Sequence, residues 1–230
     1  MSQQYIKNSS QQFKESFHEK DLGNIKVYVK DDLPKDFNLN LALQKIENLV
    51  NNRLFRTVDY IMIGQFDFIE SRDLNAAYHD GTIYVTNEQD GEDDFVDDVV
   101  HEIAHAVEVE YDQLIYEDGE LKSEFLIKRQ SLHSRMDSEL ESNLGLQNYM
   151  KTEYDVNFDN FLYYDVGYAF LRPLTFDLFY SPYAITSLNE YFANGFEAFY
   201  FHKDFKRLKS LSPVLYSKII TIDSEVNDEI

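Results

Sequence analysis

The sequence has no cysteine at any of its 230 positions. Disulfides, thiol nucleophiles and thiolate metal sites are therefore excluded together. Metal binding or acid–base chemistry would have to come from His, Asp, Glu and Tyr side chains. Glycine and proline are also scarce, and no segment rich in Gly, Ser or Pro marks a linker between domains. We therefore expect one domain, residues 1–230.

Positive charge is the second scarcity. The chain has 21 Lys and Arg against 42 Asp and Glu, a formal net charge of −21. Because this surface would repel phosphates and anionic lipids, we expect no nucleic acid and no membrane partner. Residues 1–21 are polar, and no apolar run is long enough to span a bilayer, so we expect a cytoplasmic protein. The sequence leaves the oligomeric state open.

Hydrophobic spacing places strands early and helices late. The 43% hydrophobic residues are enough for a core. Residues 9–20 are expected to form either a short helix or a frayed tail. Strands are expected over 25–29, 58–68 and 82–86, and helices over 39–50, from about 93, and over 121–140, 187–202 and 212–222. This order predicts an α+β fold.

His101-Glu102-Ile103-Ala104-His105 lies in the helix expected from about residue 93. The H-E-x-x-H spacing puts two imidazoles one turn apart on one face, directed at a common metal ion. Glu102 lies about 100° round the helix, within reach of a water on that ion. The apolar residues of the segment fall on the opposite face: Val96, Val99, Val100, Ile103 and Val107. The alternative is a surface helix with two solvated histidines.

An acidic run, Glu88 to Asp98, leads into this helix. Acidic side chains in the first turn of a helix are stabilised by the helix dipole. A calcium site is the alternative, but the 12-residue EF-hand pattern is absent. We therefore interpret the run as part of the helix start.

A catalytic zinc usually takes three protein ligands and leaves a fourth position open. The extended pattern H-E-x-x-H-x-x-G-x-x-H requires a glycine and a histidine where this chain has Glu108 and Tyr111. A carboxylate from a later helix is the remaining option, and Glu190 lies opposite the phenylalanine face of the helix over 187–202. Asn194, one turn further, is expected to accept a hydrogen bond from a ligand histidine.

Two blocks of the sequence, 95–110 and 183–219, resemble the gluzincin-type zinc metallopeptidases. This family includes the anthrax lethal factor catalytic domain and the clostridial Pro-Pro endopeptidases. Residues 101–108 match its pattern H-E-x-x-H-A-[VI]-[DE], residues 190–196 match E-[FY]-F-A-E-x-F except at position 194, and a basic segment with Pro213 follows. The resemblance implies a zincin-like fold, with a small mixed or antiparallel sheet before the ligand helix in 1–112 and a helical lobe in 113–230.

The same resemblance implies one Zn²⁺ ion, bound by His101, His105 and Glu190, and hydrolysis of a peptide or protein substrate, with an endopeptidase favoured. Glu102 would take a proton from water and pass it to the leaving amine. Tyr183, seven residues before Glu190, would stabilise the oxyanion. The family has a glutamate where this chain has Asn194, and the spacing between the blocks implies an inserted helical element over 117–179.

Further candidates have ordinary alternatives. Zinc peptidases of this type bind substrate along the strand edge before the ligand helix, which nominates Thr82, Ile83 and Tyr84; an ordinary core strand is the alternative. His133, with acidic residues at 137 and 141, is interpreted as part of a solvated face, and His79 as part of a turn. Two other functions stay open, namely a binding protein without turnover and a structural zinc closed by a fourth ligand such as His133.

Overall fold

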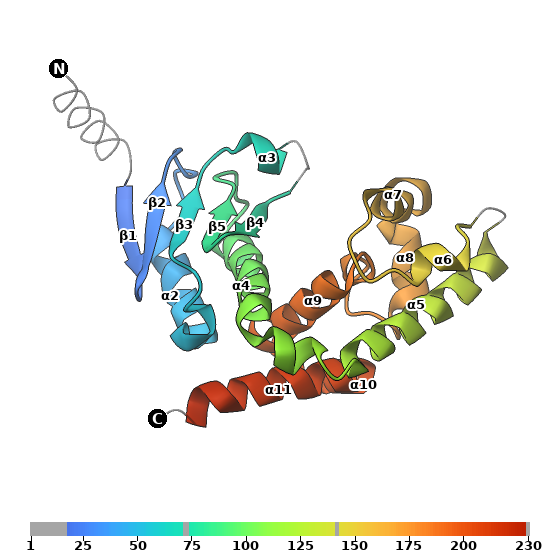
Figure 1. Ribbon diagram of the computed structural model, residues 1–230. Helices are drawn as coiled ribbons and strands as arrows, with labels where there is room; N and C mark the ends of the chain where they lie inside the picture. The colour runs from blue at the N-terminus through green and yellow to red at the C-terminus, as the bar shows by residue number, and fades with distance from the viewer. Residues whose placement is uncertain (1–17, 71–73, 141–142, 229–230) are drawn as a thin grey trace, which may run out of the picture. The chain divides into compact units, whose positions relative to one another are not determined.

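The computed structural model describes residues 18–70, 74–140 and 143–228. It has an α+β fold, with a five-stranded mixed sheet near the N-terminus and mostly helices after it, which confirms the predicted class (Figure 1). The chain divides into two compact units, residues 1–106 and 107–230. None of the helices in the described ranges combines the length and apolar character that a membrane span requires.

The sheet has the strand order β1-β2-β3-β5-β4 (Figure 1). Its strands are β1 (His18–Leu22), β2 (Ile25–Val29), β3 (Tyr60–Ile63), β4 (Ala76–His79) and β5 (Thr82–Val85). β2, β3 and β5 run parallel, whereas β1 and β4 pair antiparallel at the two edges. α2 (Leu39–Leu49) makes the crossover from β2 to β3, and η1 (Asn52–Phe55) and α3 (Asp67–Glu70) complete the connections.

β1 and β4 correct the sequence-based assignment. The helix expected over 9–20 falls mostly outside the described residues, and residues 18–20 belong to β1. Their backbone pairs with β2 in register, for example Lys20 with Val27, and such partners override a local helical pattern. β4 is a four-residue strand that the sequence analysis did not assign.

A tight hairpin joins β4 to β5 and places β5 inside the sheet. Asp80 and Gly81 have φ values of 44° and 78°, the left-handed conformations that a two-residue hairpin loop requires. β5 pairs with β3 on one side and β4 on the other. Thr82, Ile83 and Tyr84 therefore do not form the open edge that was expected to bind substrate. That edge is β4.

α4 (Glu92–Tyr116) follows the sheet and has non-helical backbone angles at Tyr111. Its first turns pack in unit 1, where the Phe95 ring contacts Phe37 edge-on at 5.6 Å. Glu92 accepts a hydrogen bond from the Asn38 backbone at 2.8 Å, and Asp93 pairs with Lys45 at 2.6 Å. Part of the acidic run is thus in contact with the segment around α2.

The second unit is helical. After the end of α4 it contains α5 (Glu120–Glu139), α6 (Leu146–Tyr149), α7 (Val156–Asn160), η2 (Phe161–Val166), α8 (Tyr168–Thr175), η3 (Tyr183–Ile185), α9 (Leu188–Tyr200), α10 (Phe205–Leu211) and α11 (Pro213–Asp228). The predicted helices over 121–140, 187–202 and 212–222 correspond to α5, α9 and α11. The segment over 117–179, expected to be helical, contains α5 to α8.

Buried cations connect the helices of this unit. The Arg129 guanidinium, on α5, donates to the carbonyls of Asn148 and Lys151 and lies 4.2 Å from the centre of the Phe158 ring. Lys128, its neighbour, donates to the carbonyls of Leu178 and Leu211. Because a buried charge is costly without hydrogen bonds, these contacts bind the connecting segments to α5.

Candidate metal centre

The H-E-x-x-H sequence lies in the regular part of α4, before the irregularity at Tyr111. The ring centroids of His101 and His105 are 5.2 Å apart, and both side chains are half-buried. The apolar stripe expected on the opposite face is fully buried: Val96, Val99, Val100, Ile103 and Val107. The helix thus buries one face in the protein core while the histidines project from the other.

Glu102 is buried, with 7% of its surface exposed, and the edge strand contacts it. The backbone N–H of Tyr78, in β4, donates to Glu102 Oε2 at 2.6 Å. In a two-residue hairpin the residues that flank the loop, here His79 and Thr82, form a hydrogen-bonded pair. Hydrogen-bonded and non-hydrogen-bonded pairs alternate along an antiparallel ladder, so the N–H of Tyr78 points away from β5. The edge of the sheet therefore holds one oxygen of this carboxylate.

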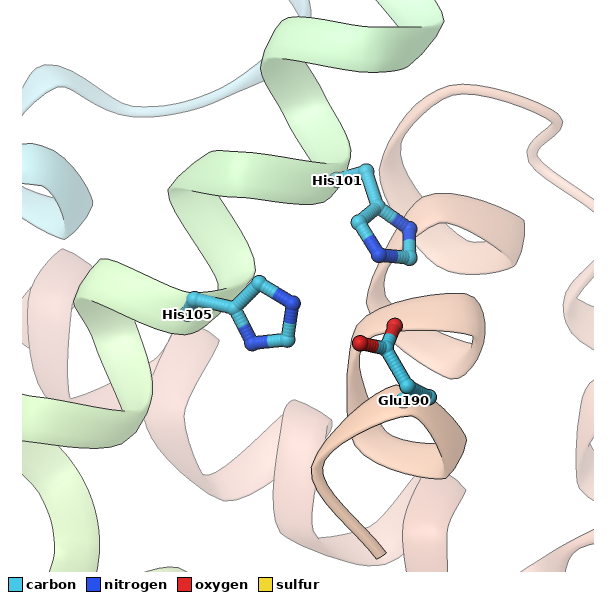
Figure 2. A group of neighbouring side chains, drawn as sticks. All are labelled: His101, His105 and Glu190. Atoms are coloured by element: carbon cyan, nitrogen blue, oxygen red, sulfur yellow. The ribbon is translucent and has the colours of Figure 1, made fainter. Parts of the chain in front are cut away.

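Glu190 lies in the first turn of α9. Ser187 caps this helix, and its Oγ accepts a hydrogen bond from the Glu190 backbone N–H at 3.1 Å. One donor atom from each of His101, His105 and Glu190 lies within 4.8 Å of the others, so these three residues could hold a metal ion (Figure 2). Two imidazoles and one carboxylate are a donor set that suits zinc.

Comparison with known proteins gives no relative. No family model, no curated protein and no solved structure matches the chain. The resemblance to the gluzincin-type metallopeptidases therefore depends on the two sequence blocks, and the zincin-like fold stays a prediction.

Asn194 is bonded to the segment that carries Tyr183. It is 3% exposed, and its Oδ1 accepts a hydrogen bond from Ser181 Oγ. Ser181 Oγ also accepts from the Ala184 backbone N–H at 3.4 Å, and Tyr183, half-buried, begins η3 between them. Through this bond the Asn194 oxygen holds the turn, while the hydrogen bond expected from a ligand histidine to Asn194 stays a prediction.

Glu108 is a site residue whose contacts the sequence analysis missed. This carboxylate is 6% exposed, and its Oε1 accepts hydrogen bonds from Asn189 Nδ2 at 2.8 Å and from the Tyr116 hydroxyl. Burial and the neighbouring Glu108 raise the pKa of Tyr116, so the phenol stays protonated and donates. The sequence feature that could have indicated this role is the position of Glu108, three residues after His105 and on the same side of the helix.

Asp98 lies one turn before His101 and is half-buried. Burial raises the pKa of Asp98 to about 6, although Gln89 Nε2 donates to its Oδ2 at 3.2 Å. A cavity of about 660 Å³ adjoins it, lined mainly by carboxylates of the acidic run: Glu88, Asp90, Asp94, Asp97 and Asp98, with Pro34, Asn75 and Gln89.

Three further histidines, His133, His79 and His202, have local partners. His133 Nδ1 is 3.5 Å from Asp137 Oδ2, and its ring packs edge-on against Tyr149 at 4.9 Å; residue 141 lies outside the described residues. His79 Nε2 is 3.4 Å from Asp80, at the exposed hairpin. His202 Nε2 is 3.1 Å from Glu197 Oε1. A second potential metal-binding group consists of Asp97, Glu197 and His202.

Proposed function

We propose that the protein is a zinc-dependent peptidase in which His101, His105 and Glu190 hold the metal. The observation that supports this most directly is the proximity of their donor atoms, within 4.8 Å of one another. The buried Glu102, adjacent in sequence to His101, supplies the acid–base group that hydrolysis requires. The fold would then be zincin-like, as the sequence resemblance implies.

The mechanism assigns separate tasks to three groups of the chain. When bound, zinc supplies Lewis acidity that polarises the scissile carbonyl and makes water easier to deprotonate. Glu102 removes a proton from the attacking water and delivers it to the leaving amine. The Tyr78 N–H orients this carboxylate through Oε2, and the Tyr183 hydroxyl donates to the carbonyl oxygen as negative charge develops there.

The substrate would bind in an extended conformation along β4. This strand pairs only with β5 among the described residues, so the outward N–H and C=O groups of Ala76 and the C=O of Tyr78 face away from the sheet. An extended peptide forms main-chain hydrogen bonds with such an edge. The sequence resemblance favours an endopeptidase over an exopeptidase.

Zinc affinity tests the ligand set. Metal-free wild-type protein should take up one zinc ion per chain in competition with a chromophoric chelator, and Glu190→Ala should bind zinc at least about 100-fold more weakly, since one of three ligands is lost. Asp159→Ala, which removes another half-buried carboxylate of the same unit, serves as the matched control. Equal zinc affinity of Glu190→Ala and wild type would remove Glu190 from the site.

A further inference from the structure

The proposed mechanism leaves one buried carboxylate without a task. Glu108 lies three residues after His105, and positions three apart on a helix are neighbours on its surface. Its Oε1 accepts from Asn189 Nδ2 at 2.8 Å and from the Tyr116 hydroxyl. A carboxylate that is 6% exposed is stable only when hydrogen-bonded, so this cluster resists separation.

Asn189 connects this carboxylate to the third ligand. It directly precedes Glu190 in the first turn of α9. The first turn of a helix lacks internal partners for its backbone N–H groups and opens readily unless something anchors it. Ser187 anchors the backbone of this turn through the Glu190 N–H, and Glu108 anchors it through the Asn189 side chain.

We propose that Glu108 is a positioning residue for Glu190. Glu108 lies on the helix that carries both histidines, and it accepts a hydrogen bond from Asn189, which is joined by a peptide bond to the third ligand, Glu190. In this arrangement Asn189 transmits the constraint, and Tyr116 supplies the second hydrogen bond that keeps the Glu108 carboxylate in place. The inference depends on the proposed function, because it assigns Glu190 to the metal.

The test is a comparison of zinc affinities of the full-length chain in two backgrounds. Asn189→Ala should weaken zinc binding about tenfold, the usual effect of removing a group that orients a ligand. In a Glu190→Ala background the same substitution should cause no further weakening, since no ligand is left to position. A purely structural role of Asn189 would weaken binding in both backgrounds.

Variants of Glu108 provide the second arm. Glu108→Gln keeps an oxygen that accepts from Asn189 and should retain most of the zinc affinity, whereas Glu108→Ala should match Asn189→Ala. Glu108→Ala with Asn189→Ala should be no weaker than either alone, because both remove one contact. Thermal unfolding of each metal-free variant establishes that the protein is folded.

Two results would overturn the inference: wild-type zinc affinity in Asn189→Ala, or equal weakening with and without Glu190. Failure of the proposed function has a different signature. In that case wild-type protein takes up no zinc, or Glu190→Ala binds it as tightly as wild type, and Glu108 then has no ligand to position.

Discussion

At the scale of single residues, the candidate centre depends on a few polar groups held by short local contacts. Glu102 is bonded by the backbone of β4, and Asn194 bonds the segment that carries Tyr183. The first contact orients the Glu102 carboxylate and the second orients the segment of Tyr183, and a small displacement of either group would change its distance to a bound substrate. Their removal should therefore affect catalysis more than folding.

Tyr78→Pro should separate these two effects. Proline removes the N–H that Glu102 accepts, and an edge strand tolerates it where that N–H faces away from the sheet. We expect kcat to fall about tenfold or more, because a hydrogen bond to a charged group is lost. Zinc affinity should stay as in wild type. Tyr78→Ala, which retains the N–H, is the control, and equal kcat in both variants would contradict this role.

Tyr183→Phe tests the proposed oxyanion donor. Loss of one such donor typically lowers kcat by about 10²–10³, so we expect a fall of that order with little change in zinc affinity. Steady-state cleavage of a single peptide substrate measures it. Tyr180→Phe is the control, since the Tyr180 ring stacks on His202 and Arg207. Similar losses in both variants would leave Tyr183 without a specific role.

Site residues could be predicted where chemistry follows from local spacing. The positions of His101, Glu102 and His105 on one helix need only the helical period, and the same period puts Glu190 opposite the phenylalanine face of α9. The bond between Ser181 and Asn194 could not be predicted, because it depends on how residues 180–187 fold back on α9. The Tyr78 contact was missed for the same reason, since it requires knowing which strand forms the edge.

At the scale of elements, the long helices were predictable and the sheet was only partly so. The strands at 25–29 and 82–85 were found, whereas the strand expected over 58–68 covers only 60–63 and residues 67–70 form α3. β1 and β4 have weak patterns and form through pairing with a neighbouring strand. Strand order is a property of the assembled sheet, which is why β5 was expected at an edge and lies inside.

The packing of α9 against α11 can be tested at Gly195, where a clash would lower the free energy of unfolding and the better helix propensity of alanine would raise it. Gly195→Ala would add a Cβ only 2.3 Å from Leu215 Cδ2, and Leu215 is fully buried. We expect a loss of about 1–3 kcal/mol in the free energy of unfolding, measured with urea, from overpacking. Leu215→Ala should rescue part of it. A gain of about 1 kcal/mol, the helix preference for alanine over glycine, would show that no clash exists.

At the scale of the whole molecule, excess negative charge coexists with a few buried cations in the second unit. Lys128 is 7% exposed, and burial lowers its pKa to about 8. Above this pH the folded protein loses the Lys128 proton, whereas the unfolded chain keeps it until near 10.5, the ordinary value. Stability attributable to this group should therefore rise as pH rises through this window.

The prediction is a difference between wild type and Lys128→Met. The free energy of unfolding of wild type, minus that of the variant, should be larger at about pH 10 than at about pH 7, by up to about 3 kcal/mol. Urea unfolding at the two pH values measures it, and subtracting the variant removes the titration of other groups. A difference that stays constant with pH would mean that burial does not depress this pKa.

The most direct test of the central claim is peptide hydrolysis by a variant that keeps its metal. Wild type and Glu102→Gln, both loaded with one zinc per chain, would be incubated with the same peptide library and the products identified by mass spectrometry. The proposed mechanism predicts cleavage by wild type and nearly none by Glu102→Gln at equal zinc content. Equal cleavage by the two proteins, or none by zinc-loaded wild type, would contradict it.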